Sequence, residues 1–153
     1  MKAKTRLFGE IEIADDKLIT LENGMIGLPE MQKFALIFDE EKEDQGKIKW
    51  FQSMDDPETA FPVIDPMLIQ EDYAPTVNDE LLRPLGELTP ENTFVLSTVT
   101  VPKNIEEMSI NLKAPIIINM DTHKGAQIIV EDEFPVKYKI YELLKSRKEK
   151  AGE

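Results

Sequence analysis

The chain has 153 residues, of which 41% are hydrophobic, and this length suits one domain with a core of its own. It contains no Cys, which excludes a disulfide framework, a thiol nucleophile and thiolate-bound zinc or iron–sulfur clusters. Asp and Glu number 30 against 18 Lys and Arg, and the net charge of −12 predicts repulsion from nucleic acid and attraction to basic partners. Because an acidic composition also serves solubility alone, the charge does not by itself identify a function.

The charge divides the chain into two parts. Residues 137–153 hold six basic and three acidic residues, so residues 1–136 hold 12 basic and 27 acidic residues, a net charge of −15. We therefore predict a domain over residues 1–140 and a basic C-terminal tail or short helix over residues 141–153. The basic N-terminus meets acidic residues before any apolar region, unlike a signal peptide, and no run approaches the roughly 20 apolar residues of a membrane helix. These features predict a cytoplasmic protein.

Short strands and turns are predicted over the first third of the chain. Residues 7–13, which alternate apolar and acidic side chains from Glu10, predict a first strand, and residues 18–21 predict a second one after a turn at 14–17. Two glycines and a proline within residues 23–29 indicate a loop.

The next segments predict a hairpin and a further strand. Residues 34–38 and 48–54 are apolar strands, and between them residues 39–46 carry five carboxylates in six positions, a composition typical of an exposed tip. Residues 60–64 predict an edge strand, because Pro62 cannot donate a hydrogen bond to a neighbouring strand.

One short helical turn is predicted in the middle of the chain, over residues 78–83. Asn78 or Asp79 would cap it and Pro84 would stop it, whereas residues 67–76 are ambiguous. Further strands are predicted at residues 93–101, which are rich in β-branched side chains, and at residues 136–140.

Residues 108–130 form the most apolar stretch and are predicted to lie at the centre of the core. Three runs rich in Ile and Val, separated by Pro115 and by a polar turn at residues 121–125, predict adjacent strands. Pro115 is expected at the start of its strand or at a bulge, and Gly125 is expected to supply the positive φ of the turn.

Many short strands at close spacing predict an all-β, mainly antiparallel fold. We expect a sandwich or a small β-barrel-like single domain with short helical turns. Of the neighbours Trp50 and Phe51, one must face inward.

Catalytic motifs are scarce. His123 is the only His and lies in a predicted turn, which excludes a multi-His metal site and makes a Ser-His-Asp triad improbable. The seven glycines form no phosphate-binding loop. Carboxylate pairs such as Asp55-Asp56 fit a glycosidase or an oxygen-ligated metal site, but 30 acidic residues generate such pairs by chance. We therefore expect no catalytic residue, no cofactor and no metal.

Five motifs in a fixed order span residues 7–131, most of the chain. In order they are Gly24-Met25-Ile26-Gly27-Leu28; Trp50-Phe51-Gln52-Ser53; Ala60-Phe61 with Asp65-Pro66 and Tyr73; Asn111-Leu112-Lys113-Ala114-Pro115-Ile116; and Gly125-Ala126-Gln127. Together they resemble the FliW family of bacterial flagellar assembly factors. The chain departs from the family pattern at Leu28, where an aromatic residue is usual, and at Phe51, where Leu is usual; both exchanges keep an apolar group.

The resemblance implies a small antiparallel β-barrel-like protein without enzymatic activity. Family members bind CsrA, a small dimeric regulator whose basic surface holds messenger RNA, and relieve its repression of flagellin synthesis. They also bind flagellin, which sequesters the factor until flagellin is secreted. An acidic body beside the basic surface would attract the regulator and repel RNA. We expect no direct binding to nucleic acid or membrane, and a monomer when the protein is free.

Residue roles follow from the chemistry of each position. Glycines, prolines and an amide that suit turns and strand ends are assigned to the fold: Gly24, Gly27, Pro66, Asn111 and Pro115. The predicted partner surface consists of carboxylates near loops and one aromatic residue: Glu71, Asp72, Tyr73, Glu131, Asp132 and Glu133. Residues 39–44 form a competing acidic patch, which is less attractive because a floppy tip loses entropy on binding.

Two other functions stay open from the residues alone. An unrelated β-barrel that carries a small ligand would have a roomy apolar cavity, whereas a filled interior favours the regulator. A carboxylate-based hydrolase would place two acidic side chains facing each other in a cleft.

Overall fold

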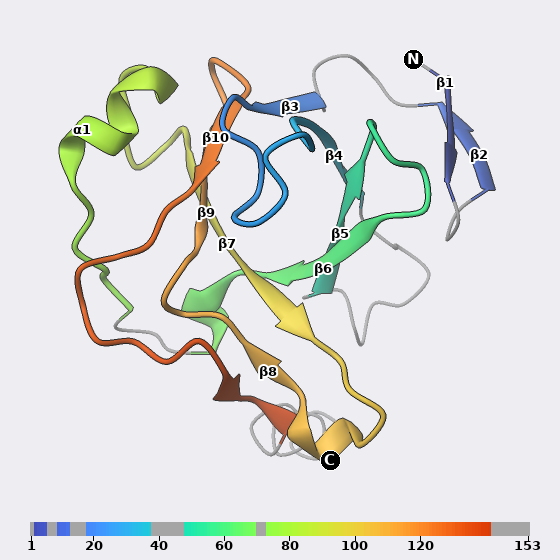
Figure 1. The fold of residues 1–153 in the computed structure, drawn as a ribbon. Helices are drawn as coiled ribbons and strands as arrows, with labels where there is room; N and C mark the ends of the chain where they lie inside the picture. The colour runs from blue at the N-terminus through green and yellow to red at the C-terminus, as the bar shows by residue number, and fades with distance from the viewer. Residues whose placement is uncertain (1, 6–8, 13–17, 38–47, 70–72, 142–153) are drawn as a thin grey trace.

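The computed structural model describes residues 2–5, 9–12, 18–37, 48–69 and 73–141, and these form a β-barrel with a smaller extension (Figure 1). The strands are β1 (Lys2–Thr5), β2 (Gly9–Glu12), β3 (Leu18–Leu21), β4 (Lys33–Ile37), β5 (Ile48–Ser53), β6 (Ala60–Ile64), β7 (Thr93–Thr100), β8 (Ser109–Ile110), β9 (Ile116–Asn119), β10 (Lys124–Gln127) and β11 (Tyr138–Lys139). The helical segments are η3 (Pro66–Leu68), α1 (Asp79–Leu82), η4 (Arg83–Leu85) and η5 (Ile105–Glu107).

Seven strands close into a barrel. They pair in the order β7, β6, β5, β4, β3, β10, β9, and β7 pairs back with β9 through Thr93 to Leu96. Every pair is antiparallel except β3–β10. Closure leaves these seven strands without an open edge along the ring, and the predicted mainly antiparallel β-barrel is confirmed.

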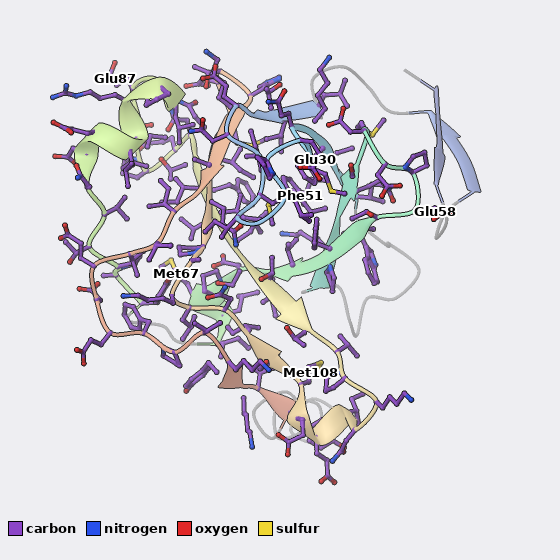
Figure 2. The ribbon with its side chains drawn as sticks, in the orientation of Figure 1. Glu30, Phe51, Glu58, Met67, Glu87 and Met108 are labelled. Carbon is purple, nitrogen blue, oxygen red and sulfur yellow. The ribbon has the colours of Figure 1, made fainter. Side chains whose placement is uncertain are left out.

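Large apolar side chains fill the interior of the barrel. The rings of Phe34 and Phe51 stack with centroids 4.3 Å apart, and both residues are fully buried. Figure 2 labels Phe51 among the side chains of the barrel. The buried members of this core are Ile19, Leu21, Met25, Phe34, Leu36, Phe51, Val63, Leu96, Ile116 and Ile118. Met25 belongs to the loop between β3 and β4, and Leu28 and Met31 of the same loop pack on the core. This loop, residues 22–32, therefore fills part of the barrel interior, and we call it the plug loop.

A second apolar cluster lies outside the barrel, where β7 continues past the ring. β8 pairs with the end of β7 and with β11, and this small sheet packs against η3 and neighbouring loops. The buried members of the cluster are Ile64, Ile69, Tyr73, Val99, Met108, Ile110, Leu112 and Ile140.

Most predicted elements are confirmed, with small differences at their ends. The helical turn α1 has Asn78 as its N-cap, whose side chain accepts a hydrogen bond from the Glu80 amide, and Pro84 lies in η4 directly after it. The described part of the predicted first strand, Gly9–Glu12, forms β2, and it pairs with β1, which the sequence analysis did not predict. Phe51 is fully buried and Trp50 half-buried, as expected of neighbours in a strand.

The prediction that residues 60–64 form an edge strand is wrong. β6 lies between β5 and β7, with Trp50 of β5 opposite Pro62. The pairing with β7 involves only Val63 and Ile64. Pro62 lies outside this pairing, so its lack of an N–H group removes no hydrogen bond between β6 and β7.

Predictions for residues 108–130 are confirmed in part. The second and third runs form adjacent antiparallel strands, β9 and β10, but the first run is not their neighbour, because β8 pairs with β7 and β11. The positive φ of the turn belongs to His123, at 58°, and not to Gly125, which lies in β10. A Cβ at Gly125 would approach Leu21 Cδ2 to 2.8 Å, so this glycine serves close packing. Pro115 directly precedes β9, as predicted.

Several predictions fall on parts of the chain outside the described residues. They concern the turn at residues 14–17, the acidic tip at residues 39–46, Glu71 and Asp72, and the tail from residue 142 onward.

Candidate partner-binding surface

The predicted acidic residues Glu131, Asp132 and Glu133 lie in a short loop with a closed base. We call residues 131–134 the acidic loop. The amide of Val130 donates to the Lys113 carbonyl (2.9 Å), and the amide of Leu112 donates to the Pro135 carbonyl (3.1 Å). Because Leu112 and Lys113 are neighbours, these two hydrogen bonds bring both ends of the acidic loop to the same place on the protein.

Asp132 holds the acidic loop to the segment before α1. Its Oδ2 accepts a hydrogen bond from the Thr76 amide (2.7 Å), and the Glu131 amide donates to the Thr76 carbonyl (2.9 Å). The Asp132 carbonyl accepts from Lys113 Nζ (2.6 Å). Asp132 is half-buried, so its carboxylate is engaged within the protein.

Tyr73 supports the acidic loop from inside. Its side chain is buried, its hydroxyl donates to the Leu112 carbonyl (2.6 Å), and its ring meets Phe134 edge-on at 4.8 Å. Burial, with the negative charge of Asp132, raises the pKa of the Tyr73 phenol to about 12. The aromatic residue that we predicted at the partner surface thus packs inside the protein.

Glu131 and Glu133 point outward. Both are exposed, whereas Ile128 and Val130 before them are buried. Ile129 and Val136, on the two sides of the acidic loop, are each 60% exposed, the largest exposure among the large apolar side chains of the described residues. The sequence analysis missed Ile129 and Val136, because residues 128–130 are all apolar and show no alternation that would mark one of them as exposed.

The carboxylate pair Asp55-Asp56 has a structural role. Asp55 Oδ2 accepts hydrogen bonds from the amides of Gln32 and Lys33 (both 2.9 Å), which fixes the end of the plug loop. Asp56 accepts from the Glu58 amide and the Thr59 hydroxyl (3.1 and 2.7 Å). Within the described part of the chain, no three His, Cys, Asp or Glu side chains come together in a group that could hold a metal ion.

A hollow of about 20 Å³ lies beside β10. Its walls come from α1, η4, the start of the plug loop and β10, and include Leu81, Pro84 and Ala126. This volume is enough for about one water molecule and far below that of a small-molecule site. Together with the filled barrel interior, it gives no support to a ligand-carrying barrel.

Polar residues of the motifs make hydrogen bonds that connect segments of the fold. The Gln127 side chain accepts from the Ile26 amide (2.9 Å) and donates to the Ala114 carbonyl (3.1 Å), so it connects the plug loop to the segment before β9. Asn111 Oδ1 accepts from the amides of Lys113 and Ala114 (both 3.0 Å). Three of the five motifs thereby meet in space.

Among the described residues, no helix is long and apolar enough to cross a membrane.

Comparison with known proteins gives consistent matches over nearly the whole chain. The model of the family described as FliW protein matches residues 2–140. A flagellar assembly factor FliW from Lachnospira eligens is 46% identical over 147 residues, which cover 95% of this chain and 97% of the relative. Another, from Lachnoclostridium phytofermentans, is 41% identical over 98% of this chain and 97% of the relative. A crystal structure of the flagellar assembly factor FliW superposes with a TM-score of 0.82 at 25% identity, and covers 92% of this chain and 97% of that structure.

Proposed function

Because the chain belongs to the FliW protein family, we propose that it is a flagellar assembly factor that acts by binding other proteins and catalyses no reaction. The observation that carries this proposal is the match to proteins of that name over nearly their full length. The engagement of Asp55 and Asp56 in backbone and side-chain hydrogen bonds supports a structural role for this pair of carboxylates.

The proposed partners are CsrA and flagellin, and the proposed place of action is the cytoplasm. Binding to CsrA lowers its occupancy by messenger RNA and thereby relieves repression of flagellin translation. Flagellin binds the factor in turn, so that accumulated flagellin withdraws it from CsrA.

The charge of the protein supports an interaction with a basic RNA-binding protein. Lys and Arg contacts to phosphates supply much of the affinity for RNA, and a body with a net charge of −12 attracts the same basic side chains. The factor need not occupy the RNA groove, because an acidic protein bound beside that groove repels RNA through space.

A titration of the purified protein against the CsrA dimer tests the proposal. It is carried out with and without the RNA target, at about 50 mM and about 300 mM salt, where the screening length differs about twofold. We expect binding that weakens at the higher salt and that lowers the fraction of RNA bound. A neutral protein of similar size serves as the control for nonspecific exclusion. If no binding to CsrA occurs at either salt concentration, the regulator role is wrong and flagellin remains as the proposed partner.

A further inference from the structure

We propose that the acidic loop, with Ile129 and Val136 on its two sides, is the docking surface for a protein that presents basic side chains next to apolar ones. This assignment rests on the proposed function, in which the basic protein is CsrA.

The apolar part of the surface consists of Ile129 and Val136, the two most exposed large apolar residues of the described chain. Ile129 and Val136 are 60% exposed, whereas Ile128 and Val130 are 4% and 1% exposed. Isolated exposed apolar residues are common on proteins, but here two of them flank the same short loop, whose ends are joined through Leu112 and Lys113. Apolar side chains beside charged ones are the composition of a protein interface.

The acidic part of the surface is held in a fixed arrangement before any partner binds. The acidic loop is fixed by the hydrogen bonds of Asp132 and Glu131 to Thr76, by Lys113 Nζ at the Asp132 carbonyl and by the contact of Phe134 with Tyr73. A surface that is already ordered loses less conformational entropy on binding. The carboxylates of Glu131 and Glu133 are therefore presented at low entropic cost.

The negative charge of the surface indicates which class of partner binds there. Two exposed carboxylates on a protein of net charge −12 disfavour nucleic acid and anionic membranes and favour a basic protein surface. The exposed Ile129 and Val136 distinguish such a partner from a free cation, since only a protein surface gains by covering them. Asp132 keeps its negative charge but makes less direct contact with a partner, because its half-buried carboxylate is directed toward the Thr76 amide of its own protein.

Paired substitutions test the surface in the full-length protein. The variant Glu131→Lys/Glu133→Lys reverses both outward charges, and Ile129→Ser/Val136→Ser removes the apolar flanks. The control Glu30→Lys/Glu87→Lys makes the same change in net charge at two exposed residues on other loops (Figure 2). Affinity for the CsrA dimer is measured by calorimetry, and thermal unfolding checks that each variant is folded. We expect both loop variants to bind about tenfold more weakly or worse, and the control within about threefold of the original protein.

Charge-neutralising variants distinguish the residues proposed to contact the partner from Asp132, which holds the loop in place. Glu131→Gln/Glu133→Gln is expected to weaken binding severalfold. Asp132→Asn, which keeps an oxygen to accept the Thr76 hydrogen bond, is expected to stay within about twofold. These variants preserve side-chain size, so they decide the question even if the Lys variant does not fold.

The outcomes show whether the proposed surface, the proposed partner or the proposed function is wrong. If the original protein binds CsrA and all loop variants bind equally well, the surface is wrong and the proposed function stands. If the loop variants lose flagellin binding and keep CsrA binding, the assignment of the occupant is wrong. If the original protein does not bind CsrA at all, the proposed regulator role fails, and this surface fails with it.

Discussion

The hydroxyl group of Tyr73 joins two segments that are 39 residues apart in the sequence. It donates to the Leu112 carbonyl at 2.6 Å in a buried site, and the Tyr73 ring supports Phe134 of the acidic loop. A phenol in this position must stay protonated, because the phenolate cannot donate to the carbonyl and would be poorly solvated. Tyr73 thus supports the acidic loop from inside the protein.

The raised pKa of Tyr73 makes the stability of the protein depend on alkaline pH. The pKa of this phenol is about 12 in the folded protein and near 10 in the unfolded chain. The contribution of Tyr73 is therefore fully present below pH 10 and is lost as the pH rises from 10 toward 12, because the unfolded chain gives up the proton first. Between pH 9 and pH 11 we expect the free energy of unfolding to fall by about 1 kcal/mol through this group.

Urea unfolding of the original protein and of Tyr73→Phe at pH 9 and pH 11 measures this contribution. The phenylalanine variant lacks the titrating group, so its loss over the same interval should be smaller by that amount. All other groups are the same in both proteins and cancel in the comparison. An identical pH dependence of the two proteins would contradict the raised pKa.

At the scale of elements, the plug loop between β3 and β4 depends on two glycines in different ways. Gly24 has φ +68°, and a Cβ there would lie 2.6 Å from main-chain atoms of Leu28 and Pro29. Gly27 has φ +87°, but a Cβ there would have no other atom within 4 Å. Both positions disfavour other residues, and only Gly24 also lacks space.

The substitution Gly24→Ala should therefore cost more stability than Gly27→Ala. We expect a loss of about 1 kcal/mol at Gly27, from backbone strain alone, and about 3 kcal/mol or more at Gly24, where the main chain must also move. Chemical denaturation of the two variants beside the original protein gives both values. Equal losses would mean that the loop adjusts freely at Gly24 and does not plug the barrel as tightly as the contacts indicate.

The positions of the strands along the sequence were easier to predict than which strands pair with one another in the sheet. Alternation and β-branched runs located β3, β5 and β7, because a strand with one buried face repeats every two residues. Which strands pair is decided by contacts between distant residues, so the place of β6 inside the sheet was not visible from Pro62. The wrong expectation of a positive φ at Gly125 has a similar cause. The side chain that demands a glycine at position 125 is Leu21, more than 100 residues earlier.

The proposed surface was predictable only in part, for the same reason. The sequence located Glu131 and Glu133, since successive carboxylates are rarely buried. It could not show that Asp132 turns toward Thr76, or that Tyr73 lies beneath the loop, because both contacts join segments more than 35 residues apart.

The net charge of −12 acts on the molecule as a whole. Like charges held on a compact body repel one another, and this repulsion decreases when the chain unfolds and the charges separate. The ion pairs Lys124–Glu22 and Lys139–Glu107, at 3.4 and 3.0 Å, involve exposed side chains and contribute little. Salt that screens the repulsion should therefore stabilise the folded protein more than it weakens these pairs.

We accordingly expect the thermal midpoint to rise by several degrees between about 10 mM and about 300 mM sodium chloride, as the screening length falls from about 30 Å to about 6 Å. The variant Glu30→Lys/Glu87→Lys provides the matched comparison. Each substitution replaces a negative by a positive charge, so the two together change the net charge from −12 to −8. Its midpoint should be higher at low salt and should rise less with added salt. A midpoint that falls as salt is added would mean that favourable ion pairs outweigh the repulsion. In that case the overall charge would not explain a salt-sensitive interaction with a basic partner, and the local charges of Glu131 and Glu133 would have to account for it alone.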